Sequence, residues 1–238
     1  MIWAFIQPVI TVLLYWFVFE FGLHQKVNDL RTGIEVPFVL WLMGGLVPWF
    51  YFQEALNGGT GVLDEYSYLV KKVVFQIDAL PVVKLISALF THAFFVVFML
   101  VVFAVMGFYP DLYVLQIVYY SFCMVILTAG LIYATSAVTV FFRDMKEVVS
   151  ILLQIGMWVT PIMWNFESMQ GIPKWAVVLL KLNPMYYIVS GYRDALINKT
   201  AFWEHLGLTL WFWGITLFTL WAGTTVFKRL RVHFADVL

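Results

Sequence analysis

Charged residues and cysteine are scarce in this sequence. Of its 238 residues, 12% are Asp, Glu, Lys or Arg and 63% are hydrophobic, whereas a soluble domain has about a quarter charged and about half apolar residues. A soluble protein of this size could not bury so much apolar surface, so the composition predicts a membrane protein. The net charge of zero argues against a nucleic-acid partner. The single Cys123 cannot form an internal disulfide, and we interpret it as a small buried apolar side chain.

Motifs of catalytic and nucleotide-binding sites are also missing. The sequence contains no G-x-x-x-x-G-K-[ST] phosphate loop and no G-x-S-x-G nucleophile motif. Its four histidines lie far apart, without the spacing of metal ligands, and we interpret His92 as a hydrogen-bonded histidine of a helix bundle. We therefore expect no catalytic residue, metal or cofactor in this chain. Because the predicted spans have no ionisable group other than His92 near their middle, we expect the energy for any transport to come from another chain.

Six uncharged runs are long enough to cross a bilayer as helices, which satisfy their own backbone hydrogen bonds in lipid. The sequence therefore predicts an all-α integral membrane protein, with one transmembrane domain over residues 1–238. The six predicted spans cover about 2–22, 36–56, 85–109, 112–142, 147–166 and 206–228. Six spans put both termini on one side, whose flanks hold eight Lys and Arg against six on the other. This bias favours cytoplasmic termini.

The connection between spans two and three has a pattern of its own. Gly58, Gly59 and Gly61 should end the second span. Apolar residues then recur at helical spacing between charged ones, which predicts a short amphipathic helix at about 63–76 on the cytoplasmic side. The sequence leaves two interpretations open: a helix lying in the lipid interface, or a docking surface for a soluble partner.

Four charges stand close together at Arg143, Asp144, Lys146 and Glu147, in the predicted cytoplasmic corner between spans four and five. Arg143 and Glu147 are four residues apart and are expected to compensate each other's charge, as are Asp144 and Lys146 in the turn. Each pair is worth on the order of 0.3 kcal/mol. A solvated corner without a partner is the simplest interpretation.

Two prolines shape the fifth span and the connection that follows it. Pro161 should kink the span, because proline donates no backbone hydrogen bond and clashes with the preceding turn, and Thr160 can help to satisfy the freed carbonyls. Pro184 disfavours helix at Asn183, so two short helices separated by a turn are predicted at about 173–197. They would dip into the outer leaflet or cap an opening, and a plain outer loop is the alternative.

Four segments resemble the membrane subunit of type-2 ABC exporters: "QPVITVLLYWFVF", "GGLVPWFYFQEAL", "FFRDMKEVVSILLQIGMWVTPIMW" and "LNPMYYIVSGYRDAL". The resemblance covers nearly the whole chain and is closest to exporters of cell-surface polymers, namely wall teichoic acid, O-antigen or capsular polysaccharide. "YWFVFEFG" and "VPFVLW" look nearest to the teichoic acid branch. The family usually has an amphipathic cytoplasmic helix before the first span, which is missing here, so we expect a trimmed sequence.

The resemblance implies a multi-pass assembly in the bacterial cytoplasmic (inner) membrane. Two copies of this chain would join two ATP-binding subunits, which bind ATP and Mg, and would export a lipid-linked polymer, favoured as wall teichoic acid with O-antigen or another polysaccharide next. The residues implied at the ATPase interface, in the coupling helix and the charged corner, are Asp64, Glu65, Tyr66, Leu69, Lys71, Lys72, Val73, Arg143, Asp144, Lys146 and Glu147. The implied residues of an extracellular gate are Thr160, Pro161, Asn183, Pro184 and Arg193.

Aromatic residues are the candidates for lining the polymer path, because their rings can stack on the apolar faces of sugars. These candidates are Tyr15, Trp16, Phe19, Trp49, Phe52, Trp158 and Trp164. For each of them, packing against lipid is the alternative interpretation.

Two other functions fit parts of the sequence. A type-2 ABC permease for a small lipid, a drug or a lipo-oligosaccharide would differ from a polymer exporter only in its substrate. A polytopic membrane enzyme acting on lipid-linked sugars could use Arg193 and Asp194 to hold a phosphate, although no second acid or metal ligand accompanies that pair.

Overall fold

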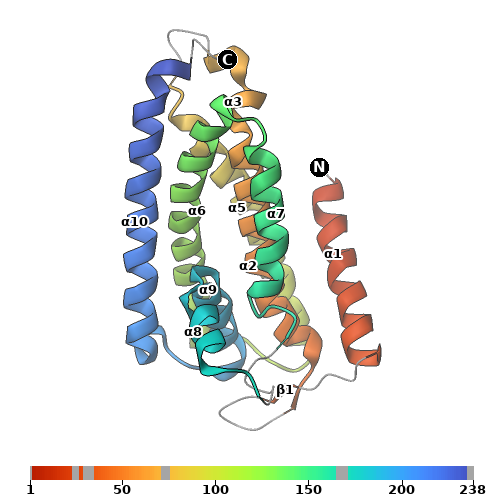
Figure 1. The fold of residues 1–238 in the computed structure, drawn as a ribbon. Helices are drawn as coiled ribbons and strands as arrows, with labels where there is room; N and C mark the ends of the chain where they lie inside the picture. The colour runs from red at the N-terminus through yellow and green to blue at the C-terminus, as the bar shows by residue number, and fades with distance from the viewer. Residues whose placement is uncertain (1, 23–26, 29–34, 71–75, 165–170, 235–238) are drawn as a thin grey trace.

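The computed structural model describes the chain except for residues 1, 23–26, 29–34, 71–75, 165–170 and 235–238. Within the described part, long helices lie side by side in a bundle (Figure 1). They are α1 (Ile2–Trp16), α2 (Phe38–Thr60), α5 (Ala79–Val105), α6 (Gln116–Phe141), α7 (Met145–Val159) and α10 (Leu206–Leu230). The bundle has two ends, which we name the α3 end, where α1 begins and α10 ends, and the β1 end (Figure 1).

Short elements connect the long helices. A π-helical turn, Phe17–Gly22, continues α1, and the strands β1 (Val27–Asn28) and β2 (Glu35–Val36) form an antiparallel pair. The other short elements are α3 (Val62–Glu65), α4 (Ser67–Val70), η2 (Leu112–Leu115), α8 (Lys174–Leu182), α9 (Pro184–Arg193), η4 (Asp194–Asn198), η5 (Phe202–His205) and η6 (Arg231–His233). The described fold is therefore helical apart from this one two-residue strand pair.

Three stretches of the described chain are long and apolar enough to cross a membrane. They are Ala79–Val105, Leu112–Phe141 and Phe202–His233. A shorter apolar helix covers Ile6–Glu20. The continuous helical stretches agree with an all-α membrane protein, since helices satisfy their backbone groups internally.

The centre of the bundle is α2, which packs against α1, α5, α6, α7 and α9. Its side chains from Phe38 to Trp49 are buried on every side, as expected for a helix that is apolar all round. Next to it, α6 and α10 approach so closely that a Cβ at Gly223 would lie 2.0 Å from the carbonyl oxygen of Gly130. Small residues at such crossings let helix backbones pack tightly in a membrane.

The connection after α2 differs from its predicted form. The helix continues through Gly58 and Gly59 and ends at Thr60. At Gly59 the absence of a side chain permits close packing, because a Cβ there would lie 2.6 Å from Ile132 on α6. The single helix predicted at about 63–76 is interrupted at Tyr66, which separates α3 from α4.

The fifth predicted span, 147–166, also needs a correction. Its helix, α7, does not kink at Pro161 but ends at Val159, and Thr160 is extended with φ −76° and ψ 126°. The residue before a proline disfavours the α region, and here this preference ends the helix. The 15 residues of α7 give a length of about 22 Å, which is less than the ~30 Å hydrocarbon core.

After the undescribed residues 165–170, α8 and α9 form a helical pair at the β1 end (Figure 1). Asn183 separates the two helices and caps α9, because its side-chain oxygen accepts a hydrogen bond from the Met185 backbone N–H at 3.0 Å. Pro184 occupies the first turn of α9, where its missing N–H has no consequence. The side chains of α9 are almost all buried, and the helix packs against α2, α6 and α10.

Candidate functional site

The break at the end of α7 is held by side chains from the α8–α9 pair. Asn183 Nδ2 donates a hydrogen bond to Thr160 Oγ1 at 2.8 Å. Arg193 Nη1 donates to the carbonyl oxygen of Pro161 at 2.7 Å, and Arg193 Nη2 donates to that of Ile162 at 2.8 Å. Non-helical backbone at membrane depth must be satisfied by protein or water, and the guanidinium satisfies it here. We name this network of Thr160, Pro161, Ile162, Asn183 and Arg193 the break clasp.

Arg193 is buried on α9, with 8% of its surface exposed. Its Nε donates to the Trp41 carbonyl oxygen at 3.3 Å, and its guanidinium carbon lies 3.4 Å from the centroid of the Trp41 ring. Space for the guanidinium comes from Gly45 on α2, where a Cβ would lie 2.9 Å from Arg193 Nη2. One side chain thus fastens α9 to α2 and to the chain after α7. The predicted gate residues Thr160, Pro161, Asn183 and Arg193 meet in this network, next to Pro184.

The α3 end brings together the two segments predicted to contact an ATPase. Lys146 Nζ on α7 lies 2.5 Å from Asp64 Oδ2 on α3, and Lys84 on α5 lies 2.8 Å from Glu65 Oε2. The Lys84 ammonium is also 5.6 Å from the centroid of the Tyr66 ring. Lys146 therefore forms an ion pair with Asp64 on a separate helix, and not with a residue of its own corner as expected.

Further residues of the predicted ATPase interface have different positions. Arg143 and Asp144 are exposed in the turn before α7, and Glu147 is exposed in its first turn. Lys71, Lys72 and Val73 lie outside the described residues, as does the side chain of Leu69. Beneath the corner, a small apolar cluster fixes α3 on the bundle: Val62, Leu63, Leu80, Ala137, Val140, Phe227 and Phe234.

The aromatic residues predicted to line a polymer path do not share one cavity within the chain. Trp49 and Phe52 line a cavity of about 260 Å³ between α2, α6, α7 and α9. Trp16 lines an apolar pocket of about 160 Å³, and Phe19 stacks on Phe38 with ring centroids 5.2 Å apart. Trp158 is 63% exposed on α7.

The remaining two candidates sit apart from these. Trp164 donates from its indole nitrogen to the Trp158 carbonyl oxygen at 2.9 Å. Tyr15 lines a different cavity, which lies between α1, α2, α5 and α7.

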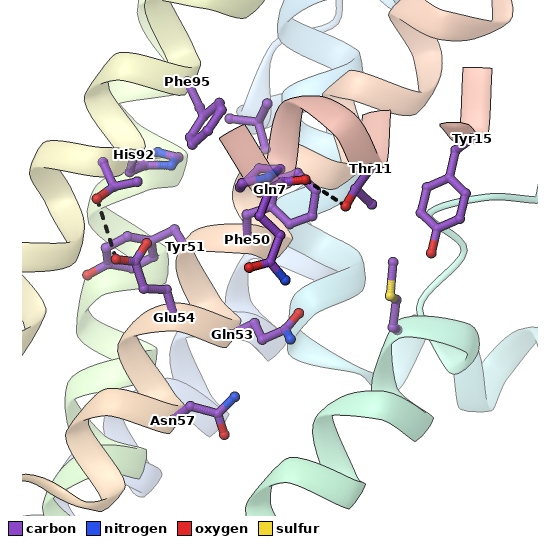
Figure 2. Close-up of a pocket in the computed structure, with 14 residues that line it drawn as sticks. Gln7, Thr11, Tyr15, Phe50, Tyr51, Gln53, Glu54, Asn57, His92 and Phe95 are labelled. Atoms are coloured by element: carbon purple, nitrogen blue, oxygen red, sulfur yellow. Dashed lines mark hydrogen bonds between the residues drawn. The ribbon is translucent and has the colours of Figure 1, made fainter. Parts of the chain in front are cut away.

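That cavity is a polar cleft of about 450 Å³ between α1, α2, α5 and α7. Figure 2 shows Gln7 and Thr11 of α1 and Gln53, Glu54 and Asn57 of α2 around it. The other lining residues are Pro8, Tyr15, Val47, Phe50, Tyr51, Thr91, His92, Phe95 and Met157. Glu54 accepts a hydrogen bond on Oε1 from the Thr91 hydroxyl at 3.4 Å, drawn as a dashed line in Figure 2.

The sequence analysis missed this cleft except for Tyr15. The sequence does contain an indication of the cleft: two pairs of polar residues four apart within apolar helices, Gln7 with Thr11 and Gln53 with Asn57. Residues four apart lie on one helix face, so each pair lines the same wall. Which helices face each other across the cleft depends on the tertiary fold, so the pairs alone could not define the cavity.

His92 stands at the inner wall of the cleft and is hydrogen bonded within the bundle. Its Nε2 lies 2.9 Å from the Tyr192 hydroxyl and 3.2 Å from Ser121 Oγ, and these two hydroxyls are 2.6 Å apart. The ring is buried with 5% exposure. These contacts agree with the interpretation of His92 as a structural histidine that joins α5, α6 and α9.

Comparison with known proteins gives a consistent result. Residues 1–197 match the family described as ABC-2 type transporter. The O-antigen export system permease protein RfbA of Myxococcus xanthus is 25% identical over 99% of this chain and 86% of its own length. A protein of the same name from Klebsiella pneumoniae is 25% identical over 100% and 86%. The polysialic acid transport protein KpsM of Escherichia coli is 26% identical over 95% and 84%.

Proposed function

This chain belongs to the family of ABC-2 type transporters, and on that basis we propose that it is the membrane subunit of an ATP-driven exporter for a lipid-linked cell-surface polymer. The observation that carries the proposal is the set of relatives aligned over nearly the whole chain. They are named as permeases for O-antigen export and as a polysialic acid transport protein. Physical chemistry agrees, because a long polar polymer cannot cross hydrocarbon unaided when each polar group is costly to desolvate.

The energy would come from a separate ATP-binding subunit, which binds ATP and Mg. We propose a homodimer of this chain with two such subunits in the bacterial cytoplasmic membrane, with both termini in the cytoplasm. In this arrangement α1, α2, α5, α6, α7 with its break, and α10 are the six spans. The α3 end would face the cytoplasm, since most of the Lys and Arg predicted on the cytoplasmic side flank it.

The α3 end is the proposed docking surface for the ATP-binding subunit. Through the Asp64–Lys146 ion pair, a displacement of α3 would reach α7 directly. At the other end of α7, the break clasp joins the chain to α9. A push on α3 would therefore be transmitted along α7 to the proposed gate helices α8 and α9.

The identity of the polymer is the finer part of the proposal. Wall teichoic acid was favoured from "YWFVFEFG" and "VPFVLW", and it stays a prediction. The names of the relatives support a polysaccharide such as O-antigen more directly.

The test is co-expression with candidate ATP-binding subunits, followed by purification and by depletion of the chain in cells. We expect an ATP-binding subunit to co-purify and the surface polymer to decrease on depletion. If none co-purifies and the surface polymer is unchanged, the proposal is wrong. If an ATP-binding subunit co-purifies but only the export of a small lipid or drug is lost, the chain is a permease for small molecules.

A further inference from the structure

We propose that the polar cleft between α1, α2, α5 and α7 binds uncharged, hydroxyl-rich sugar units of the polymer, and that Glu54 discriminates against anionic ones. This inference rests on the proposed function as a polymer exporter and adds the substrate class. The cleft holds about 450 Å³, within the size range of pockets for small ligands.

The lining of the cleft has the chemistry that a sugar requires. Gln7, Gln53 and Asn57 carry amides, which both donate and accept hydrogen bonds. Among the described residues, the amides of Gln53 and Asn57 make no side-chain hydrogen bond, and both side chains are exposed. A polar side chain on a membrane helix is costly unless it meets water, protein or a ligand. These two amides are therefore free to bind hydroxyl groups.

Aromatic rings stand beside the amides. Tyr15 from α1 and Phe50 from α2 are partly exposed in the same lining, whereas Tyr51 behind them is buried against His92. A sugar ring has polar edges and apolar faces, and a cleft with both amides and aromatic rings matches both kinds of surface. A purely apolar cargo such as a lipid tail would leave the amides without partners, which lowers its affinity.

The charge of the lining sets the selectivity. Glu54 is the one carboxylate among the described lining residues, and none of these residues is Lys or Arg. The nearest lysines along the helices of the cleft, Lys84 and Lys146, are paired with Glu65 and Asp64 at the α3 end. A sugar carboxylate or phosphodiester in the cleft would therefore meet a like charge, and no lysine or arginine among the described lining residues compensates it. The inference thus favours a neutral polysaccharide over wall teichoic acid, whose units are linked by phosphodiesters. At about 6–8 Å and an effective dielectric constant of about 20–40, this repulsion weakens binding roughly five- to hundredfold.

The Glu54 carboxylate has a neighbour on α5. Thr91 Oγ1 on α5 donates to its Oε1 at 3.4 Å, as Figure 2 shows. This long contact places the side chain at the wall between α2 and α5, one turn from Asn57 and next to Gln53. Substitution by Gln removes the charge and retains an oxygen that can accept from Thr91.

The experiment compares two ligands on the complete complex, with the ATP-binding subunit, in lipid nanodiscs. The ligands are polyprenyl-diphosphate-linked tetrasaccharides of equal length, one of neutral hexoses and one of hexuronic acids. Kd is measured for both ligands on the wild type, on Glu54→Gln and on Glu204→Gln. Glu204 is exposed in η5, just before α10 begins at the β1 end of the bundle (Figure 1). It does not line the cleft, so the last variant is a matched control.

We expect the wild type and Glu204→Gln to bind the neutral ligand about tenfold more tightly than the hexuronic acid ligand. In Glu54→Gln the Kd values of the two ligands should differ by no more than about twofold. Gln53→Ala should weaken both ligands alike. Equal affinities for the two ligands in the wild type, or a ratio of Kd values in Glu54→Gln that equals that of the wild type, would overturn the inference. Neither result would contradict the proposed function as an exporter. If neither ligand binds and neither alters ATP hydrolysis, the proposed function itself fails.

Discussion

The break clasp can be tested by replacing Arg193 with Met, which is long and apolar but donates no hydrogen bond. The substitution leaves the carbonyl oxygens of Trp41, Pro161 and Ile162 without this donor. Each buried carbonyl that loses its partner costs about 1–3 kcal/mol, and loss of the stacking on Trp41 adds about 0.5–2 kcal/mol. Removal of a buried charge returns several kcal/mol of desolvation free energy. We estimate a net destabilisation of about 3 kcal/mol from these opposing effects.

The assay is thermal unfolding of the purified complex in nanodiscs, monitored through tryptophan fluorescence. For a chain of this length, about 3 kcal/mol lowers Tm by roughly 6–12 °C. The Tm of Arg193→Lys should lie between those of the wild type and Arg193→Met, because one ammonium group cannot replace the planar, forked donors of a guanidinium. Arg229→Met, at an exposed position near the end of α10, is the matched control and should shift Tm by less than about 2 °C.

Export measured below the unfolding temperature separates stability from gating. If the clasp positions the gate helices, Arg193→Met should reduce polymer export even where the protein is folded. A Tm within about 2 °C of the Arg229→Met control would refute the energetic reasoning. Normal export in a destabilised Arg193→Met would show that the clasp only stabilises the fold.

The other predictions concern the contact between α3 and α7 and the contact between α6 and α10. Lys146→Asp should uncouple ATP hydrolysis from export with little change in Tm, since a partly exposed ion pair contributes only about 0.2–1 kcal/mol. The double variant Asp64→Lys with Lys146→Asp should restore coupling. If the double variant stays uncoupled, this ion pair has no direct role in coupling. Gly223→Val should lower Tm by roughly 5 °C or more, because its Cβ would lie 2.0 Å from the Gly130 carbonyl oxygen. Gly214→Val, where nothing lies within 4 Å of the added Cβ, should be close to wild type in the same measurement.

The helices of this bundle could be predicted from the sequence because they depend on local patterns. The long uncharged runs correspond to α1, α2, α5, α6, α7 and α10 in order. The turn at Asn183 follows from Pro184 alone, since the steric effect of proline acts on its neighbour. A kink was predicted at Pro161 within a span that continues to residue 166, but α7 ends at Val159. A proline in an apolar run is compatible with either a kink or a stop.

The contacts that organise the candidate sites depend on residues distant in sequence, which is why the sequence did not reveal them. Arg193 was identified as a gate residue, but its bonds to Pro161 and Trp41 join segments 32 and 152 residues apart. Lys146 was expected to balance charges within its own corner, and it pairs with Asp64, 82 residues away. Local spacing predicts pairs on one helix. These pairs join different helices, so they can be predicted only when the positions of α2, α3, α7 and α9 relative to one another are known.

Polar groups within this apolar bundle divide into two kinds, and their surroundings indicate different roles. The donors of Arg193 face carbonyl oxygens of the chain itself, so the desolvation of its charge is offset within the fold and its removal should act on stability. The amides of Gln53 and Asn57 face the open cleft of Figure 2, so their removal should act on the cargo and leave stability almost unchanged. Gln53 and Asn57 lie at the end of the predicted span 36–56, where exposed amides meet water at little cost in free energy. Their place on the wall of the polar cleft fits a polar cargo that passes along α2, and the Gln53→Ala variant tests that role.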